Sequence, residues 1–237
     1  MYPIILALDS AGSGCSVAVA RGDEIVAVVH NEDLHGQAEI LLPLVDKAVR
    51  EANLLPSALE VIAATVGPGS FTGIRAGLAA ARGIAFSAGA RLVGVSSFAA
   101  VAAGSAQHGV SDKHFLLVAL ESRREDLYVQ FFDPGQNAVT APAATMPSAL
   151  SNFVALTIGA APLLIAGDAA QRAADALSPC LNAIALADSP LTAVGASRTA
   201  LRDLRQGKTD HEPSPFYLRP PDVKLPAIPP IPGLIRE

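Results

Sequence analysis

The chain has 237 residues, of which 51% are hydrophobic and 16% are charged. This composition supplies enough apolar side chains for one large domain or two ordinary ones, and it excludes a disordered chain. The formal net charge of −5 argues against a protein that grips nucleic acid alone, because such proteins neutralise phosphates with a basic excess.

The first half of the chain predicts three strands, followed by helices that alternate with further strands. The strand-like runs are short, rich in Val and Ile, and separated by turns that contain Gly or Asp. The first helix shows its apolar residues on one stripe. In chain order we expect strands at 3–8, 15–20 and 24–29, a helix at 37–52, a strand at 61–66, a helix at 71–88, a strand at 91–95 and a short Ala-rich helix.

The second half repeats this order more loosely. The run LALDS (6–10) aligns with VALES (118–122), and the same offset without gaps places CSVAV (15–19) on LYVQF (127–131). In chain order we expect strands at 115–120, 127–132 and around Ala138, a helix near 147–157, a strand at 163–166, and helices near 168–177 and 190–206.

Duplicated βββαβα halves are typical of the actin-like ATPase architecture of sugar kinases and Hsp70. We therefore predict an α/β protein of this fold with two lobes, at about 1–105 and 106–215. In such proteins each lobe opens with a hairpin that faces the nucleotide phosphates between the lobes.

The C-terminal segment differs from both halves. Residues 213–237 contain eight prolines, which remove backbone donors and fix φ. From 216 to 237 we expect an extended Pro-rich tail. Pro-rich segments can bind groove-type partners, but a tail without a partner is the favoured interpretation.

The first hairpin, LDSAGSGCS (8–16), carries a candidate phosphate site. An Asp at a strand end followed by Ser and Gly suits phosphate and Mg²⁺, since the turn offers N–H groups and hydroxyls while the carboxylate holds a metal-bound water. An ordinary polar turn is the alternative. The counterpart LESRRED (120–126) has Glu121 in place of the Asp and lacks glycine, which argues against symmetric phosphate binding. The candidate nucleotide-binding residues are Asp9, Ser10, Ser13 and Gly14.

The stretch GPGSFTGIRAG (67–77) joins a predicted strand to a helix, but it matches no phosphate-loop motif. A Walker loop fails because no Lys follows the glycines, and a dinucleotide fingerprint fails because Thr72 stands at the third glycine position. Ser70 or Thr72 can instead cap the helix by accepting hydrogen bonds from its free N–H groups.

Small residues recur along the helix that follows. Gly73, Gly77 and Ala81 are four positions apart and lie on one stripe, which lets another helix approach closely. Arg75 and Arg82 share a neighbouring face. Two interpretations stay open, namely packing within the same lobe and contact with a partner protein.

The sequence carries no motif for metal binding or nucleophilic catalysis. The five histidines form no HxxxH or HExxH pair and no GxSxG occurs, so we predict no metal and no catalytic residue. Cys15 and Cys180 lack metal-ligand spacing, and Cys15 lies in an apolar run typical of a buried thiol. No run reaches the about 18 uncharged apolar residues of a membrane span, so we expect a soluble, cytoplasmic protein without a membrane partner.

Five segments, spread over nearly the whole chain, resemble the TsaB family. GPGSFTGIR is the most specific of them. The segments are ILALDSAGSGCSVAV (5–19), HGQAEILLPLVDKAV (35–49), GPGSFTGIRAGLAAARGIAF (67–86), GVSSFAAVA (94–102) and PFYLR (215–219).

The resemblance implies a subunit of the bacterial machinery that makes threonylcarbamoyladenosine at position 37 of tRNAs reading codons that begin with A. TsaB-like proteins are paralogues of TsaD, the catalytic subunit, which carries a metal-binding HxxxH in its first lobe. His35 precedes a helix without a second histidine, in agreement with a non-catalytic role. The resemblance therefore implies a subunit that binds and activates TsaD, with TsaE as a further partner, a competing homodimer, and tRNA held indirectly through TsaD.

The same resemblance implies an interface on the helices at 37–52 and 71–88. No cofactor is expected of the subunit by itself, while ATP or ADP with Mg²⁺ at the complex interface is left open. Two features depart from the family, which are Glu121-Ser122-Arg123 at the second hairpin and the long extension after Arg219. The expected interface residues are Leu41, Val45, Ser70, Thr72, Gly73, Arg75, Gly77 and Arg82.

Two other functions compete with this expectation. A stand-alone actin-fold ATPase or phosphotransferase would use Asp9 and the 12–14 loop. A glycoprotease-like metallopeptidase is disfavoured because no pair of histidines could hold its metal.

Overall fold

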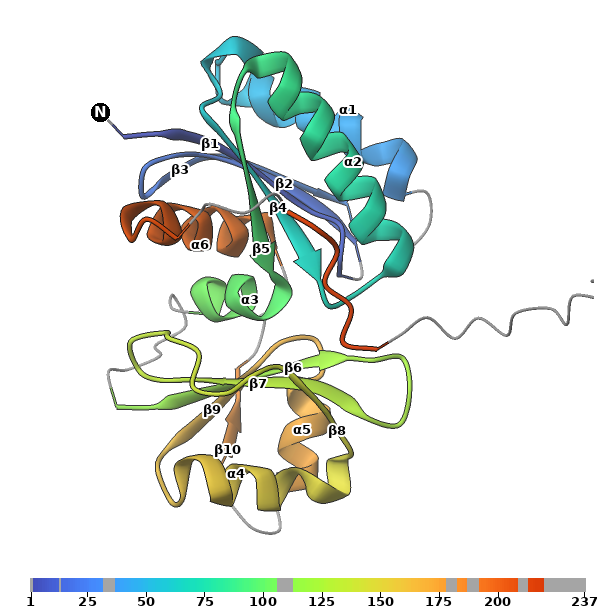
Figure 1. The fold of residues 1–237 in the computed structure, drawn as a ribbon, viewed down its shortest axis with the longest axis vertical. Coiled ribbons are helices and arrows are strands. Elements are labelled where there is room, and N and C mark those ends of the chain that lie inside the picture. Colours follow the sequence, from blue (N-terminus) through green and yellow to red (C-terminus); the bar gives the residue numbers. More distant parts are fainter. Residues whose placement is uncertain are drawn as a thin grey trace, which may run out of the picture.

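The computed structural model describes residues 2–12, 14–31, 37–105, 113–177, 183–186, 192–208 and 213–219. Figure 1 shows two lobes stacked along the long axis, each built on one sheet. The first half of the chain forms β1 (Ile4–Asp9), β2 (Cys15–Arg21), β3 (Glu24–Asn31), α1 (Gln37–Glu51), β4 (Val61–Gly67), α2 (Phe71–Ala88), β5 (Arg91–Ser96) and α3 (Ser97–Ser105).

The second half forms the same order of elements. A 3₁₀ turn at Pro56–Ala58 precedes β4, and a second one at Pro147–Ala149 precedes α4. The elements are β6 (Phe115–Glu121), β7 (Leu127–Phe132), β8 (Ala143–Thr145), α4 (Leu150–Ile158), β9 (Leu163–Ala166), α5 (Ala170–Leu177), β10 (Ala183–Ala185) and α6 (Ala193–Arg205).

The second half differs from the predicted elements at three points. The predicted strand around Ala138 is wrong, because Ala138 forms only an isolated bridge with Phe132 and the third strand is β8. The helix predicted near 147–157 begins at Leu150, since a 3₁₀ turn precedes it. The three-residue strand β10 was not predicted, because so short a run gives no periodic signal.

The two sheets have the same strand order. The first is β3-β2-β1-β4-β5 and the second is β8-β7-β6-β9-β10. In each, the first strand pairs antiparallel with the second and parallel with the fourth. This duplication of βββαβα units confirms the predicted α/β, actin-like fold class.

The hairpins show that the ungapped alignment of the two halves is wrong by one residue. Asp9 pairs with Ser16, seven positions on, whereas Glu121 pairs with Leu127, six positions on. The second hairpin thus closes one residue sooner, and Leu127 is the counterpart of Ser16 instead of Cys15.

The joint between the lobes consists of α3 and α6, each of which packs on the sheet of the other half (Figure 1). From α6, Ala196 and Ala200 join the buried cluster of the first sheet, while Phe98 of α3 joins that of the second sheet. The two helices also touch each other, since a Cβ at Gly195 would lie 2.0 Å from the carbonyl oxygen of Ala100. The expected division at residue 105 therefore separates the strands of the two sheets, while α6 completes the first lobe.

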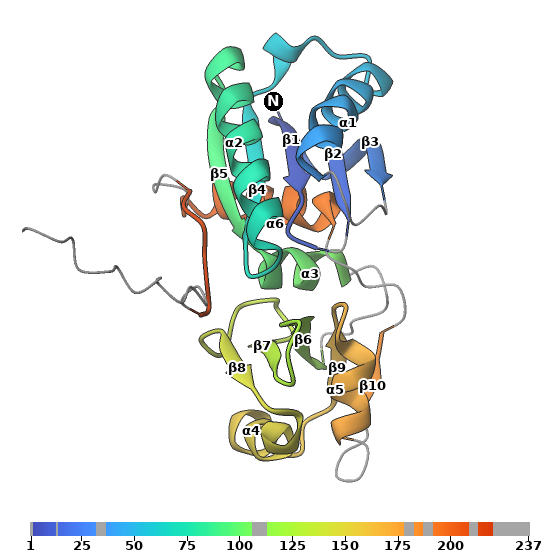
Figure 2. The ribbon, with the colours of Figure 1, turned by 90° about the vertical axis from the view of Figure 1, so that its right-hand side faces the viewer.

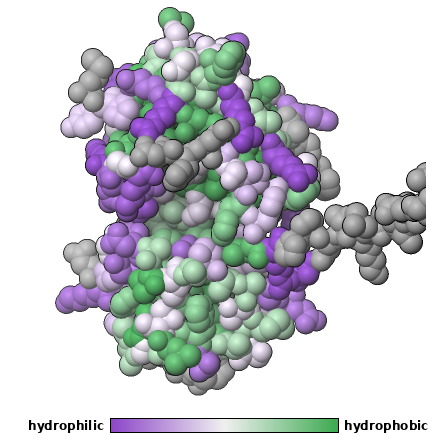
Figure 3. Space-filling model, in the orientation of Figure 1, coloured by the Kyte–Doolittle hydropathy of each residue, from purple (hydrophilic) through white to green (hydrophobic). Residues whose placement is uncertain are grey.

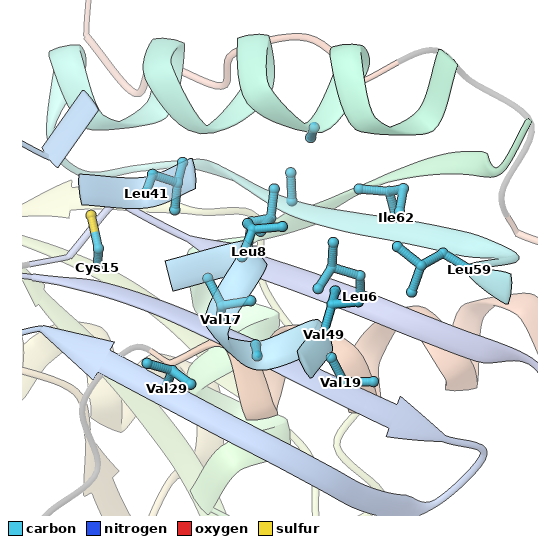
Figure 4. Packing of buried hydrophobic residues seen from close by; sticks show 14 of the residues in the cluster. Leu6, Leu8, Cys15, Val17, Val19, Val29, Leu41, Val49, Leu59 and Ile62 are labelled. Atoms are coloured by element: carbon cyan, nitrogen blue, oxygen red, sulfur yellow. The ribbon is translucent and has the colours of Figure 1, made fainter. Parts of the chain in front are cut away.

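Helices α1 and α2 cover the other face of the first sheet. Their inward side chains, including Leu41 and Leu78, pack on β1, β2 and β4 to form the largest part of this core. Figure 4 shows Cys15 among these side chains, near Leu41. The predicted buried thiol is thus confirmed at Cys15, where burial raises the pKa to about 11. Cys180 lies outside the described residues.

Two further expectations concern the membrane and the tail. In the described ranges, no helix combines the length and the apolar character that crossing a membrane requires. Of the predicted Pro-rich tail at 216–237, the structure describes only 216–219.

Candidate functional site

A concave apolar surface lies between α1, α2 and the turn that precedes β4. Figure 2 shows α1 and α2 side by side on the same face of the first lobe. The groove between them has a volume of about 1010 Å³. It is called the α1–α2 groove below, and it is lined by Leu41, Leu42, Val45, Asp46, Val49, Leu55, Pro56, Ser57, Leu59, Ala76, Ala79, Ala80, Gly83, Ile84, Ser87 and Ala88.

The groove exposes large apolar side chains at its rim. Leu42 and Leu55 are 55% and 73% exposed, and Asp46 is the one ionisable residue among those that line it. Asp46 pairs with Arg50 one turn along α1, at 2.9 Å. A concave apolar surface with large exposed apolar side chains is typical of a protein-binding surface.

Exposed apolar residues also occur elsewhere. In Figure 3 the visible face of the second lobe is mostly white to green, and Leu156 on α4 is 79% exposed. What distinguishes the α1–α2 groove is its concave shape together with the apolar rim.

The structure divides the predicted interface residues into three groups. Leu41 and Val45 are buried and line the floor of the α1–α2 groove. Ser70 caps α2, as predicted, because its Oγ accepts a hydrogen bond from the N–H of Gly73 at 3.2 Å, while Thr72 is exposed. Gly73, Gly77 and the two arginines of α2 face other parts of the same chain.

The small-residue stripe that includes Gly73 and Gly77 faces the interior of its own lobe. The Oγ of Ser10 donates to the carbonyl oxygen of Gly73 at 2.8 Å. A Cβ at Gly77 would lie 2.4 Å from the same Oγ. This stripe therefore packs against the first hairpin, and its burial corrects the expectation that it contacts a partner.

A second stripe of small residues on α2 does line the groove, and the sequence analysis missed it. Its members recur at intervals of three and four, as on one face of a helix. The sequence pattern that could have predicted this stripe is AxxAAxxGxxxS in the same helix. The stripe consists of Ala76, Ala79, Ala80, Gly83 and Ser87.

The two arginines of α2 bind the segment 213–219. Arg82 donates to the carbonyl oxygen of Pro213 at 2.7 Å, and Arg75 donates to the hydroxyl of Tyr217 at 3.2 Å. The Arg75 guanidinium also lies 3.6 Å from the centre of the Phe71 ring. Both arginines therefore hold the C-terminal segment against the first lobe, which their sequence positions did not predict.

The segment 213–219 also connects the two lobes. The N–H of Phe216 donates to the carbonyl oxygen of Val66 at 2.7 Å. Leu218 packs on the cluster of the second sheet, and Arg219 forms an ion pair with the buried Asp126. The PFYLR motif thus spans from β4 to the second hairpin.

The carboxylate of Asp9 is buried at the end of β1 and only 2% exposed. Its Oδ1 accepts hydrogen bonds from the Thr65 hydroxyl at 2.7 Å and from the N–H of Ala11 at 3.0 Å. Burial raises the pKa of Asp9 to about 6, with a further contribution from the negative charge of Asp168 in the second lobe. Asp9 is therefore buried at the end of β1, with a carboxylate of the second lobe near enough to raise its pKa further.

The second lobe has two further carboxylates, those of Asp168 and Glu121, which lie close to each other. Asp168 accepts a hydrogen bond from the N–H of Glu121 at 2.9 Å, and burial raises the pKa of Asp168 as well. Glu121 forms an ion pair with Arg172 at 2.8 Å. Arg172 also donates to the carbonyl oxygens of Arg124 and Glu125, so it holds the second hairpin turn closed.

These residues do not fit a phosphate cradle. The hydroxyl of Ser10 holds α2, Gly14 is half-buried at the turn, and Ser13 lies outside the described residues. Asp9 is buried, and its Oδ1 already accepts hydrogen bonds from Thr65 and Ala11. In the part of the chain that the structure describes, no group of three or more His, Cys, Asp or Glu side chains could hold a metal ion.

Comparison with known proteins agrees with this architecture. The family model described as "TsaD: tRNA N6-adenosine threonylcarbamoyltransferase" matches residues 32–212. The chain belongs to this family.

Curated relatives of this TsaD-family chain include a TsaB protein. The tRNA threonylcarbamoyladenosine biosynthesis protein TsaB of Haemophilus influenzae is 30% identical over 127 residues, which are 52% of this chain and 51% of that protein. The alignment thus spans about half the length of that relative. An uncharacterized protein of Mycobacterium tuberculosis is 28% identical over 225 residues, or 93% of each chain. The TsaB resemblance is thereby confirmed.

Solved structures support the fold of this TsaD-family chain. YeaZ from Pseudomonas aeruginosa has a TM-score of 0.76 and 23% identity, over 91% of this chain and 100% of that one. An ROK hexokinase from Thermus thermophilus has a TM-score of 0.50 and 13% identity, over 86% and 99%. At these identities the comparison concerns the fold, and the sugar-kinase neighbour is consistent with the actin-like class.

We expect Gly77→Ala to lower the free energy of unfolding by about 1–3 kcal/mol, because the new Cβ overlaps the Ser10 Oγ. In a Ser10→Ala background the loss should shrink or vanish, since the Ser10 Cβ lies 3.8 Å away. Gly83→Ala is the matched control, because no atom lies within 4 Å of its Cβ position. Urea unfolding of Gly77→Ala, Ser10→Ala, the double variant and Gly83→Ala measures the coupling free energy between positions 10 and 77. If the stability losses of Gly77→Ala and Ser10→Ala are strictly additive in the double variant, the contact is contradicted.

The pKa of Asp9 gives a pH-dependent prediction. The Asp9 carboxyl binds its proton more tightly in the folded state than in the unfolded chain. The contribution of Asp9 to stability therefore falls as pH rises from about 4 to about 6. Asp9→Asn keeps the accepting oxygen but does not ionise. We expect this variant to be more stable than the parent at pH 8, by about 3 kcal/mol, and about equally stable near pH 4.

Urea unfolding at the two pH values measures this difference. Asp23→Asn serves as the control. The exposed Asp23 pairs with Arg205, which lowers the pKa of its carboxyl, so this variant should be less stable than the parent at pH 8. An Asp9→Asn protein that is less stable than the parent at pH 8 would show that burial does not penalise the charge.

Proposed function

We propose that this chain is a non-catalytic subunit for the N6-threonylcarbamoylation of adenosine 37 in tRNA, and that it binds and activates a TsaD-type catalytic subunit through the α1–α2 groove. The observation that carries the proposal is the exposed apolar groove on a TsaD-family chain. The TsaB relatives, which are threonylcarbamoyladenosine biosynthesis proteins, support the same pathway.

The chemistry of the groove suits a pair of helices from a partner of the same fold. Leu42 and Leu55 expose apolar surface to water, and its burial stabilises a complex by about 25 cal/mol per Å². On the α2 side, Ala79 and Gly83 leave room for a close helix approach. A paralogous partner would present its equivalent helices and form a four-helix bundle.

The net charge of this chain indicates which subunit of the proposed complex would bind the tRNA. With a net charge of −5, this chain is a poor ligand for tRNA, so the partner would hold the tRNA. The proposal requires no cofactor of this subunit and places TsaE as a third component of a cytoplasmic assembly. A homodimer formed through the same groove would compete with the heterodimer.

One other function has a specific observation in its favour. Asp9 and Asp168 come from different lobes and both have raised pKa values, and perturbed carboxylates are common at functional sites. ATP hydrolysis by the purified chain, lost in Asp9→Ala, would support an ATPase. The inward hydrogen bonds of Ser10 and Asp9 make this the weaker candidate.

The partner surface is tested with a matched pair of arginine substitutions. Ala79 lines the groove and Ala155 lies on α4, and both are exposed helical alanines. We expect Ala79→Arg to reduce heterodimer formation with TsaD at least tenfold on gel filtration, and to reduce threonylcarbamoyladenosine formation in proportion. Ala155→Arg should change neither.

Two results would overturn the proposal. The first is equal product from the reconstituted reaction with and without this chain, and the second is an undiminished heterodimer with Ala79→Arg. Substitution of Gly77 cannot serve here, because that residue is buried against Ser10.

A further inference from the structure

A second cavity lies at the joint between the lobes and is built from both halves of the chain. Its volume is about 320 Å³. Small-molecule sites in proteins have volumes of about 300–1,000 Å³, so this cavity suits a small ligand. Its walls are the end of β5 with the first turn of α3, the strand β7 with the turn that follows it, and the C-terminal end of α6 with Lys208. It is called the joint cavity below.

The side chains of the joint cavity favour an anion. Arg202 and Lys208 both line it, and none of the described residues in its walls is acidic. The α1–α2 groove has the opposite character, since its walls are mostly apolar and its one ionisable residue is Asp46. Cationic side chains at a small polar cavity attract a negatively charged small molecule, whereas an apolar segment of a protein would find little to bind there.

The Arg202 guanidinium is held in place by the protein and still has a donor to spare. Its Nη1 donates to the carbonyl oxygen of Gln136 at 3.1 Å, and its Nε lies 3.4 Å from the Oδ1 of Asp203. Arginine has further N–H groups, and within the described ranges its Nη2 donates to no partner. Arg202 is therefore oriented in advance and can donate to an oxyanion.

Lys208 supplies the second positive charge. Asp203, which is not a wall residue, offsets part of the charge of Arg202. Lys208 forms no ion pair with any residue that the structure describes, and its side chain is exposed at the mouth of the cavity. The joint cavity therefore retains a net positive charge.

Two polar groups beside these cations also have unused hydrogen-bonding capacity. Gln130 is 7% exposed, and its Nε2 donates to the carbonyl oxygen of Thr140 at 2.9 Å, while its Oε1 accepts from no group in the described part of the chain. The hydroxyl of Ser96 accepts from the N–H of Ala99 at 3.1 Å and keeps its own O–H to donate. Polar atoms of buried residues are usually met by protein, water or ligand, so Gln130 offers an acceptor to a ligand.

We propose that the joint cavity binds a small organic anion, namely a phosphate ester or carboxylate that also carries a hydroxyl or amine. Arg202, Lys208 and the Ser96 hydroxyl would hold its oxyanion, and the Oε1 of Gln130 would accept from its hydroxyl or amine. The ring of Phe132, also in the wall, would contact its carbon atoms. This site is separate from the α1–α2 groove and does not depend on the function proposed above.

A ligand in this cavity would connect the two lobes. Its oxyanion would contact α6, which packs on the first sheet, while Gln130 belongs to β7 of the second sheet. Because the cavity exists only when the lobes are joined, the ligand would bind the folded chain and stabilise it.

Nuclear magnetic resonance of the ¹⁵N-labelled full chain, without a partner protein, tests the site. Sodium phosphate and sodium succinate are titrated separately at constant pH and ionic strength. We expect saturable shifts of the amide signals of Ala99, Gln136 and Asn137, which lie in the wall of the cavity, and none at Ala79 in the α1–α2 groove or at Ala155 on α4. A response to phosphate alone identifies a phosphate ester, a response to succinate alone identifies a carboxylate, and both support the site.

Three charge-removing variants test which side chains bind the anion. Arg202→Gln and Lys208→Gln should each weaken the affinity at least about fivefold, because each removes a charge-assisted hydrogen bond. Lys208 is exposed, so its substitution leaves the fold intact. Arg205→Gln is the matched control, since Arg205 lies at the same end of α6 but pairs with Asp23 outside the cavity, and it should change the affinity less than about twofold.

Two results would overturn the proposal. The first is the absence of a saturable shift at the wall residues with either anion. The second is an equal loss of affinity in Lys208→Gln and Arg205→Gln, which would show attraction by the overall charge instead of a site. Since no partner is present, neither result bears on the α1–α2 groove, and a failure of the partner surface leaves the anion site standing.

Discussion

The first lobe depends on the contact between the amino end of α2 and the turn of the first hairpin. The N–H of Ser70 donates to the carbonyl oxygen of Ala11 at 2.8 Å, and a Cβ at Gly69 would lie 2.1 Å from that oxygen. Ser10 then ties the first turn of α2 to the hairpin from the other side. Because only glycine permits this approach, GPGS sets the position of α2, and the position of α2 sets the width of the groove beside α1.

The same contact explains the chemistry at the end of β1. With Ser10 turned toward α2, Asp9 is left in the interior with Thr65 as its side-chain partner. The carboxylate loses solvation there, and repulsion by Asp168 adds to the effect, so both factors raise its pKa. A hairpin that resembles a phosphate loop in sequence therefore serves in this chain to hold a helix.

Local sequence patterns predicted most of the fold. Alternating Val and Ile runs located the long strands, one-sided apolar stripes located α1 and α2, and the repeated order of elements predicted the duplicated fold. Short elements such as β10 carry too few residues for a period, and the one-residue difference between the hairpins depends on pairing across strands. Those features follow from tertiary contacts.

The candidate site was harder to predict for the same reason. Helix α2 has small residues on two sides, at Gly73 and Gly77 and again at Ala76, Ala79 and Gly83. The spacing alone cannot predict which of the two stripes is buried, because that depends on the position of the first hairpin. The roles of Arg75 and Arg82 depend on a segment more than 130 positions away in sequence.

The exchange of α3 and α6 between the lobes has a consequence for synthesis of the chain. Ile5 and Ala7 of β1 are covered by α6, which is synthesised long after β1. Domains usually fold in the order in which they are made. Here one face of the first sheet stays uncovered until α6 has been synthesised, so the nascent chain exposes the apolar side chains of β1 while the second sheet is being made.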